Sequence, residues 1–274
     1  MPPLRNVLVT GGGSGLGRAT ALRFAREGAR VAVCGRREGP LAATADLLRA
    51  AGAADTRAVT CDVRYDDDVA KMADALHGAW GPFDVVVNNA AGNFVCPAEK
   101  LSPNGWRAVI EIVLNGTFFV SRAFGLAMID AHGADGRARS FVNVVADYAW
   151  GAGPGVIHSA SAKAGVLALT RTLAVEWARF GIRANAVSPG PFRSEGTDKN
   201  LWLDETLAAE IRDSIPMRRF TTGEEVAEAI AFLADEARAA YVTGACLPVD
   251  GGHWLTGTNL GFLGALARGI PAKR

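Results

Sequence analysis

The chain has 274 residues, 49% of them hydrophobic, and its 29 basic and 28 acidic residues leave a formal charge of +1. This length and apolar content fit one large α/β domain with a single core, and the charge balance offers no basic face to nucleic acid or an anionic membrane. Four widely spaced cysteines without a Cys-x-x-Cys pair argue against a zinc site or other metal site and against a disulfide framework, and favour a reducing compartment.

The N-terminal residues lead directly into a predicted strand at 6–10, which leaves no room for a signal segment. No apolar run reaches the length of about 20 residues that spans a bilayer. We therefore expect a cytoplasmic protein without a membrane span, whose partner is a small or apolar molecule.

The first predicted unit is the strand at 6–10, a glycine-rich loop and a helix over 19–27. The loop consists of Gly11, Gly12, Gly13, Ser14, Gly15, Leu16 and Gly17. Glycines let the backbone approach a pyrophosphate, and the start of a helix adds unpaired N–H groups and the positive end of its dipole. The order of strand, loop and helix favours a dinucleotide phosphate site, and a purely structural turn is the alternative.

The second predicted strand, at 30–34, leads to Arg36 and Arg37, where an NAD-binding unit usually carries an acidic residue for the ribose hydroxyls. Guanidinium groups complement a 2′-phosphate, so we predict NADPH in preference to NADH, with two solvated arginines as the alternative. A helix over 41–51 and a strand over 57–60 follow. Asp62 and Val63 come directly after that strand, and Asp62 is placed to accept from an adenine amine. The aspartates at 66–68 are expected to cap a helix and complement its dipole.

The fourth predicted strand, at 83–87, is nearly all apolar, as a parallel strand covered on both faces should be. Small and amide residues follow it, among them Asn89, Ala90 and Asn93, and leave space for a ribose and a nicotinamide. A long helix is predicted over 103–131. Its apolar positions are Trp106, Val109, Ile110, Val113, Phe118 and Phe119. Packing in the core and contact with a second subunit both account for so much apolar surface.

A buried strand over 141–145, a glycine-rich turn and a helix entered near Ser159 form the central stretch. Tyr148 in the turn and Lys163 on the helix would lie at the carboxyl edge of the sheet, where ligands bind in open α/β sheets. There they can polarise a carbonyl beside a bound cofactor. An ordinary loop aromatic and a solvated lysine are the alternative. The other two tyrosines, Tyr65 and Tyr241, are predicted to lie away from this edge.

The C-terminal part begins with a strand over 184–187 that ends in a stiff turn, Pro189, Gly190, Pro191 and Phe192, over the nicotinamide position. Residues 193–219 have an irregular polar pattern, which we interpret as a substrate lid and not as a second domain. A helix over 222–234 opens with Thr222 and Glu225 in capping-box spacing, and a last strand follows at 245–249. We thus predict one doubly wound parallel α/β sheet of the Rossmann type over 1–255, followed by a C-terminal tail at 256–274.

Several motifs together resemble the short-chain dehydrogenase/reductase superfamily over about residues 5–255. They are Thr10-Gly11-x-x-x-Gly15-x-Gly17, Asn88-Asn89-Ala90, Lys163 and Pro189-Gly190. The superfamily's usual catalytic tyrosine stands four residues before the lysine, where this chain has Ser159, and its asparagine position is Val113. A catalytically silent NADPH-binding protein is therefore one alternative.

Other segments resemble the 2,4-dienoyl-CoA reductases, especially the mitochondrial type. They are Asn89-Ala90-Ala91-Gly92-Asn93-Phe94, Leu101-Ser102-Pro103-Asn104, Leu114-Asn115-Gly116-Thr117, Ser159-Ala160-Ser161-Ala162-Lys163 and Pro189-Gly190-Pro191. That family's acid is a tyrosine upstream of the usual position, which implies Tyr148, with Ser159 and Lys163 in matching register. The resemblance implies that Asn93 and Tyr148 bind the thioester oxygen. It also implies substrate contacts at Arg64, Phe94 and Ser102, and cofactor contacts at Arg36, Asp62, Lys163 and Pro189 to Phe192.

The resemblance implies a homotetrameric, NADPH-dependent reductase of 2,4-dienoyl-CoA thioesters that gives 3-enoyl-CoA, an auxiliary step of fatty-acid oxidation. Hydride addition at the far end of the diene moves negative charge onto the thioester oxygen, where Tyr148 and Asn93 are the expected donors. Lys163 is expected to hold the nicotinamide ribose and to favour the charged form of a nearby phenol. Protonation at carbon follows, from water or a side chain. A second alternative is reduction of a 3-oxoacyl thioester or another ketone, with Tyr148 protonating an alkoxide.

Overall fold

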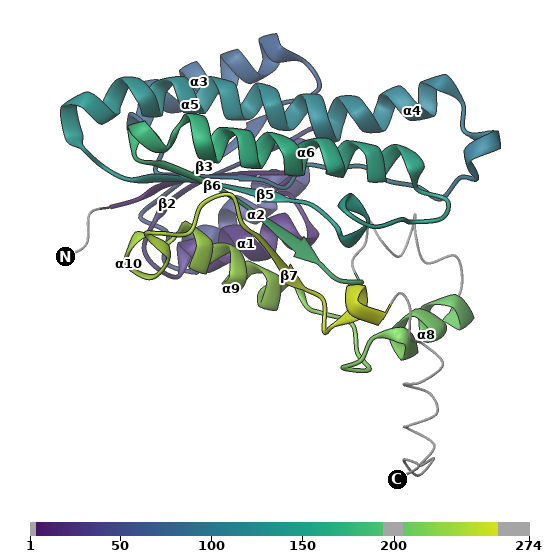
Figure 1. The fold of residues 1–274 in the computed structure, drawn as a ribbon. Coiled ribbons are helices and arrows are strands. Elements are labelled where there is room, and N and C mark those ends of the chain that lie inside the picture. The colour runs from purple at the N-terminus through teal and green to yellow at the C-terminus, as the bar shows by residue number, and fades with distance from the viewer. Residues whose placement is uncertain (1–3, 194–204, 257–274) are drawn as a thin grey trace.

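The computed structural model describes residues 4–193 and 205–256, which form a seven-stranded parallel sheet with helices on both faces (Figure 1). The strands are β1 (Asn6–Thr10), β2 (Arg30–Gly35), β3 (Asp55–Thr60), β4 (Val85–Asn88), β5 (Arg139–Val144), β6 (Ile182–Pro189) and β7 (Cys246–Val249). Their order is β3-β2-β1-β4-β5-β6-β7. Strands β2 and β3 are added on one side of β1 and strands β4 to β7 on the other, so the strand order reverses between β1 and β4. A crevice outside the carboxyl ends of the strands at such a switch point is where ligands bind. The predicted doubly wound α/β fold is confirmed.

The helices form one layer on each side of the sheet (Figure 1). One layer holds α1 (Gly15–Ala25), α2 (Glu38–Ala50) and α9 (Gly223–Ala234), and the other holds α3 (Asp66–Trp80), α4 (Pro103–Ile110), α5 (Gly116–Asp135) and α6 (Ile157–Glu176). Shorter elements are η1 (Ala98–Lys100), the π-helical η2 (Glu111–Asn115), η3 (Asp147–Ala149), η4 (Ala178–Phe180), α8 (Glu205–Ser214), α10 (Glu236–Ala239) and η5 (His253–Thr256). Strands β1, β4, β5 and β6 are buried throughout, as parallel strands covered on both faces must be.

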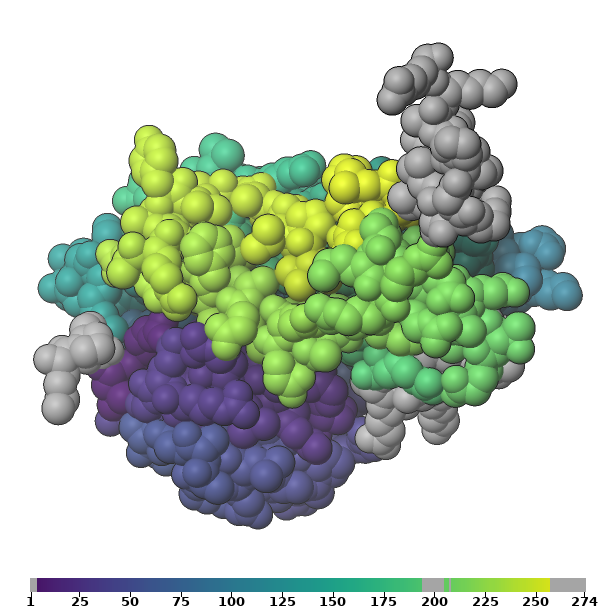
Figure 2. Space-filling model, turned by 90° about the horizontal axis from the view of Figure 1, so that it is seen from below, coloured from purple at the N-terminus to yellow at the C-terminus, as the bar shows by residue number. Residues whose placement is uncertain are grey.

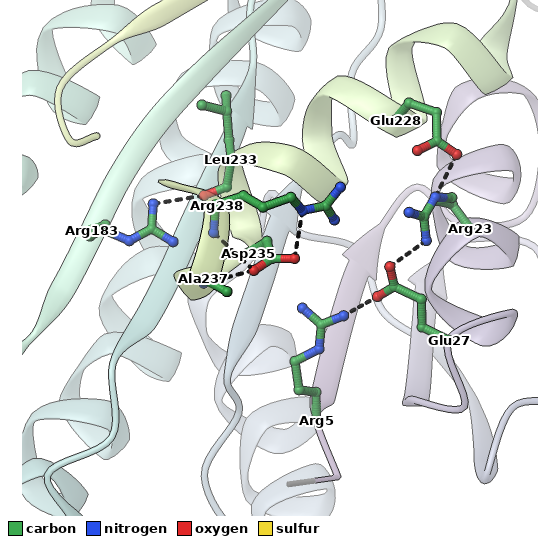
Figure 3. A network of polar contacts seen from close by, with 9 residues as sticks. All are labelled: Arg5, Arg23, Glu27, Arg183, Glu228, Leu233, Asp235, Ala237 and Arg238. Carbon is green, nitrogen blue, oxygen red and sulfur yellow. Dashed lines mark hydrogen bonds and ion pairs between the residues drawn. The ribbon is translucent and has the colours of Figure 1, made fainter. Parts of the chain in front are cut away.

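Helices α1 and α9 pack side by side and join the two ends of the described chain. Phe24 of α1 and Ile230 of α9 belong to one buried cluster with the valines of β1 and β2. Figure 2 shows this face, with the C-terminal part directly beside the purple N-terminal part. At the surface, Arg23 of α1 forms an ion pair with Glu228 of α9 and a second, local one with Glu27 just after α1 (Figure 3). Exposed pairs of this kind contribute little, so the apolar cluster holds the helices together.

Two predicted helix starts differ from the structure. Helix α1 begins at Gly15 and not at 19, so Gly15, Leu16 and Gly17 form its first turn and bring its N–H groups nearer the predicted phosphate position. The aspartates at 66–68 lie in the first turn of α3, whose N-cap residue is Tyr65 without a side-chain cap, so only their dipole role is retained. The capping box of Thr222 and Glu225 is confirmed.

The predicted long helix is a continuous helical stretch, α4, η2 and α5, interrupted only by the π-helical turn around Val113. Its inner face, with Val113 and Phe124, is buried in the core, while Phe118 and Leu126 are exposed. By length and composition alone the stretch Pro103–Asp135 would also suffice to cross a membrane, but half of its most apolar window is buried inside the protein. The core role is thus confirmed, and subunit contact stays a prediction for the exposed face.

The predicted irregular pattern over 193–219 is wrong for part of its length, because residues 205–214 form helix α8. This segment contains good helix formers, and Pro216 follows closely after its last turn. Ala208 and Ile215 are buried and anchor it to the domain. Residues 194–204 of the expected lid, and the tail from 257 onward, lie outside the described residues.

Candidate active site

A cavity of about 590 Å³ lies at the carboxyl edge of the sheet, a volume typical of small-molecule sites. Nearly all of the residues predicted to bind the cofactor line it. They are Gly11, Gly13, Ser14, Gly15, Leu16, Gly17, Arg36, Arg37, Asp62, Val63, Asn89, Ala90, Lys163, Pro189, Gly190, Pro191 and Phe192, and Asn93 and Tyr148 join them. The structure therefore brings one end of the predicted dinucleotide site and the predicted reacting groups into a single cavity.

The glycine end of the cavity is built by close backbone packing. Gly11 has φ +67°, a conformation that favours glycine, and a Cβ atom on Gly17 would lie 2.3 Å from the carbonyl oxygen of Gly11. Gly12 packs behind the loop, where its Cβ would strike Val33. Asn89 fixes the loop from β4, because its side-chain amide donates to the carbonyl of Thr10 at 2.9 Å. The result is a tightly packed loop that has no room for a methyl group at Gly12 or Gly17 and leaves its backbone open to a phosphate.

Charged residues line the adenosine side of the cavity. Arg36 and Arg37 form no ion pair with any residue in the described part of the chain, so their guanidinium groups remain available to a phosphate. Asp62, in contrast, forms an ion pair with Arg64. Its Oδ2 accepts from Nε of Arg64 at 3.0 Å and from Nη2 at 2.6 Å. The Arg64 guanidinium is the main reason why the pKa of Asp62 is lowered. The structure thus places Arg64, a predicted substrate contact, against the predicted adenine acceptor.

The reacting groups come from three elements and meet around the hydroxyl of Tyr148. The hydroxyls of Tyr148 in η3 and Ser159 in α6 share a hydrogen bond of 3.1 Å, and the amide of Asn93 donates to the Tyr148 oxygen at 3.4 Å. Lys163, one helical turn after Ser159, donates to the carbonyl oxygen of Val144. Ser159 is buried behind the phenol and does not line the cavity. Tyr148 and Ser159 are therefore in contact, and Lys163 lies one turn further along α6 with its ammonium on Val144.

Burial controls the charges of these groups. It raises the pKa of Tyr148, and the hydrogen bond from Ser159 opposes this only in part, so the phenol stays protonated at neutral pH. Lys163 is not among the causes of this shift, because its ammonium donates to the carbonyl of Val144, and its expected effect on the phenol stays a prediction. Burial also lowers the pKa of Lys163 to about 8. The site offers a neutral hydroxyl donor.

Two of the predicted substrate contacts lie beside the cavity and do not line it. The ring of Phe94 packs on His158, with centroids 4.4 Å apart. Ser102 is the N-cap of α4 and accepts from the backbone N–H of Gly105 at 3.1 Å. Gly105 lies close to both, since its Cβ would be 3.1 Å from the Phe94 ring. Substrate binding by these residues stays a prediction.

The structure adds a polar pair that the sequence reasoning missed. Asp147 and His253 both line the cavity, and the Asp147 carboxylate lies 3.0 Å from Nδ1 of His253. The other Asp147 oxygen accepts from the backbone N–H of Tyr148 at 2.8 Å. The two residues are 106 positions apart, so no spacing in the sequence joins them. In the sequence, only the position of Asp147 next to Tyr148 and the glycine turn before His253 could have pointed to this pair.

The chain is similar to proteins that are named as reductases of acyl thioesters. Residues 11–253 match a family model described as enoyl-(acyl carrier protein) reductase. A probable 2,4-dienoyl-CoA reductase of Bacillus subtilis, named as (2E)-enoyl-CoA-producing, is 47% identical over 91% of this chain and 96% of its own length. The peroxisomal 2,4-dienoyl-CoA reductase of Danio rerio, named as (3E)-enoyl-CoA-producing, is 36% identical over 92% of this chain and 82% of its own.

Solved structures agree with this placement. A short chain dehydrogenase of Bacillus anthracis has a TM-score of 0.78 at 44% identity and covers 91% of this chain and 96% of its own. The 3-ketoacyl-(acyl-carrier-protein) reductase of Brucella melitensis, complexed with NADH, has a TM-score of 0.83 at 29% identity, with coverage of 91% and 98%. The family match over most of the chain and the shared fold lead to one conclusion: this chain belongs to the short-chain dehydrogenase/reductase family and is an oxidoreductase.

Proposed function

We propose that the protein reduces 2,4-dienoyl-CoA thioesters with NADPH and releases a 3-enoyl-CoA, as an auxiliary step in the oxidation of unsaturated fatty acids. One observation carries the proposal. The half-buried Tyr148, whose hydroxyl is held by Ser159 and approached by Asn93, lines the cavity, while the superfamily's usual tyrosine position is a serine in this chain. The relatives named as 2,4-dienoyl-CoA reductases support the substrate class.

The nicotinamide dinucleotide fits the residues that are present. The glycine cradle accepts the pyrophosphate, and the buried ammonium of Lys163 has one carbonyl partner and hydrogens left for ribose hydroxyls. Arg36 and Arg37 are the groups that would hold the 2′-phosphate, which is why we propose NADPH. When bound, the reduced nicotinamide supplies the hydride that adds to carbon 5 of the dienoyl group.

The role of the side chains follows from where the negative charge develops. Addition at carbon 5 places that charge on the thioester oxygen through the conjugated system, so donors aimed at this oxygen lower the barrier. The neutral phenol of Tyr148 and the amide of Asn93 lie 3.4 Å apart, close enough for both to donate to a single substrate oxygen. Ser159 then donates to the phenol oxygen and keeps it in place. Lys163 orients the ribose and with it the reacting face.

The test is an absorbance assay of the purified protein with NADPH and a panel of dienoyl-, enoyl- and 3-oxoacyl-CoA thioesters. We expect the dienoyl and NADPH absorbances to disappear together in equal amounts. Consumption of NADPH with the 3-oxoacyl thioester alone would favour a ketone reductase, and binding of NADPH without turnover would favour a silent cofactor-binding protein. NMR of the product separates 3-enoyl from 2-enoyl thioester, a distinction that matters because the names of the relatives include both.

We also propose a homotetramer in the cytoplasm. Exposed apolar side chains on the long helix and on α6, including Phe118, Leu126 and Val175, would be covered by neighbouring subunits. Light scattering at micromolar concentration should report four copies, and a monomer would contradict the assembly. Cell fractionation of the tagged full chain tests the location.

A further inference from the structure

The Asp147–His253 pair has no part in the mechanism above, although it lines the same cavity beside Tyr148. The reduction needs a proton on carbon after the hydride, and the donors to the thioester oxygen do not provide it. Resting on the proposed function, we infer that His253 is a further catalytic residue: its imidazolium delivers this proton to carbon 2 of the substrate, with Asp147 as the residue that positions it.

The geometry fixes the imidazole next to the oxygen donor. Asp147 accepts from Nδ1 of His253 with one carboxylate oxygen and from the backbone N–H of Tyr148 with the other. This bond occupies Nδ1, while Nε2 has no partner in the described part of the chain and the residue faces the cavity. An Asp–His pair with one ring nitrogen free is the arrangement by which proteins hold a histidine acid or base in a fixed orientation.

The other titratable groups that line the described cavity are poor proton donors at neutral pH. Burial raises the pKa of Cys61 to about 12, and Asp62 is an ion-paired carboxylate without a proton to give. Arginines do not release a proton in proteins. The raised pKa of Tyr148 makes it a hydrogen-bond donor rather than an acid. The Lys163 ammonium, whose pKa burial lowers to about 8, donates to Val144, and in the proposed function its other hydrogens bind the ribose and not the substrate carbon. The imidazolium of His253 is what remains.

Charges around His253 keep it protonated near neutral pH. Asp147 of η3 is the main cause of its raised pKa, and Asp250 in the turn after β7 adds to it, while burial acts in the opposite direction. The segment after α8 presents apolar Pro216 and Met217 to the glycines before His253 and brings no opposing charge from these side chains. The imidazolium is therefore favoured by both carboxylates that face it.

The position of His253 also determines which carbon receives the proton. Tyr148 binds the thioester oxygen, and Asp147, the residue before it, holds His253. Of the two dienolate carbons that can accept a proton, carbon 2 and carbon 4, carbon 2 is the one beside the thioester carbonyl, so we assign the proton to it. The Nε2–H bond breaks and its proton bonds to carbon 2, the enolate electron pair forms the new C–H bond, and the thioester carbonyl is restored. The neutral imidazole regains a proton from water. Protonation there leaves the double bond between carbons 3 and 4, which is a 3-enoyl product.

The key variant is His253→Asn, because the asparagine amide can replace Nδ1–H as donor to Asp147 but carries no titratable proton. We expect unchanged NADPH affinity and a fall in kcat of about 10²-fold, the lower end for losing a general acid. Without the acid at carbon 2, slow protonation by water should produce a mixture that contains the conjugated 2-enoyl thioester. In D₂O, the unmutated protein should place one solvent deuterium on carbon 2.

The pH profile gives a second readout. The acid must be protonated, so kcat of the unmutated protein should fall as pH rises through the raised pKa of His253, and this fall should vanish in His253→Asn. Lys163 also loses its proton as pH rises, at a pKa of about 8, but its effect should appear in the KM for NADPH and persist in the variant.

A structural role is separated by a matched control. Trp254, the next residue, packs edge to face on Trp150, the residue that follows η3, with ring centroids 5.9 Å apart, and this is a second contact between η5 and the η3 region. Trp254→Phe loosens this contact but leaves the imidazole of His253 in place. The variant should therefore form the same product as the unmutated protein, with the same pH profile of kcat. Unchanged kcat, product and pH profile in His253→Asn would overturn the inference, as would the same product change in Trp254→Phe. If the unmutated protein does not reduce dienoyl thioesters, both the proposed function and this inference fail.

Discussion

The two ends of the cavity are built in different ways. The pyrophosphate end consists of backbone from one continuous segment, residues 11–17, where the absence of side chains makes the space. The reacting end consists of side chains from separate segments, Asn93, Tyr148, Lys163 and His253, held by burial and hydrogen bonds. The first end should therefore be sensitive to added volume, and the second to the loss of single polar atoms.

Removing the phenolic oxygen should have the largest effect at the reacting end. Tyr148→Phe keeps the ring, so NADPH affinity should be unchanged while kcat for a dienoyl thioester falls by about 10²–10³, the scale for one oxyanion donor. Tyr65→Phe is the matched control, because that tyrosine is exposed and away from the cavity. Equal activity of the two variants would remove the phenol from the mechanism.

Replacing the buried Lys163 should lower activity but raise the stability of the unliganded protein. Lys163→Met should lose turnover and NADPH affinity, yet stabilise the unliganded protein by on the order of 3 kcal/mol, because burial lowers the lysine pKa from 10.5 to about 8. Below pH 8 lysine is protonated in both the folded and the unfolded chain, so the full desolvation cost applies. As pH rises from about 8 towards 10.5, only the folded state has lost the proton, and the advantage of the variant should shrink. Thermal unfolding against pH measures this.

The control for that experiment is Lys71→Met, since the Lys71 side chain is 79% exposed and only loosely paired with Asp68. It should change neither turnover nor the pH dependence of unfolding. Lower stability of Lys163→Met at pH 7 would mean that the hydrogen bond to Val144 outweighs the cost of burying the charge.

At the adenosine side, a charge reversal should alter the choice of cofactor. Arg36→Asp should weaken NADPH binding about tenfold to a hundredfold, equivalent to about 1.5–3 kcal/mol for one charge-assisted contact, and should affect NADH far less. Fluorescence titration with both cofactors measures the ratio. Equal affinity of the unmutated protein for NADH and NADPH would refute the proposed preference.

Adding one methyl group tests the pyrophosphate end. Gly17→Ala places a Cβ against the backbone of Gly11 and should cost about 1–3 kcal/mol of stability, together with NADPH affinity. Gly39→Ala in α2 is the control, since no atom lies within 4 Å of its added Cβ. It should leave binding unchanged. If both substitutions have the same effect, close packing at Gly17 does not shape the site.

The contrast between a site built from one continuous segment and a site built from separate segments also explains which features the sequence could predict. The strands, the glycine loop and the capping box are local patterns, so their residues identify them without knowledge of the fold. Helix α8 was missed because its polar composition resembles a loop, and its anchors Ala208 and Ile215 are recognised only once burial is known. The early start of α1 was missed because glycines ordinarily disfavour helix, yet here they open one.

At the reacting end, prediction depended on how far apart the partners lie. Tyr148, Ser159 and Lys163 belong to one stretch, and a family resemblance was enough to place them. His253 is joined to Asp147 only by the arrangement of η5 against η3, which no periodicity or spacing encodes. The raised pKa of Tyr148 likewise depends on burial by surrounding elements, and for that reason the sequence alone did not indicate it.

The most direct test compares Tyr148→Phe with Ser159→Ala in single-turnover reduction of a dienoyl thioester at saturating NADPH. Both residues share the same hydrogen bond, but only Tyr148 lines the cavity. We predict the loss of about 10²–10³ for Tyr148→Phe and less than about tenfold for Ser159→Ala, the scale of one ordinary hydrogen bond. Near-full activity in Tyr148→Phe, with activity abolished in Ser159→Ala, would contradict the assignment of Tyr148 as the donor to the thioester oxygen.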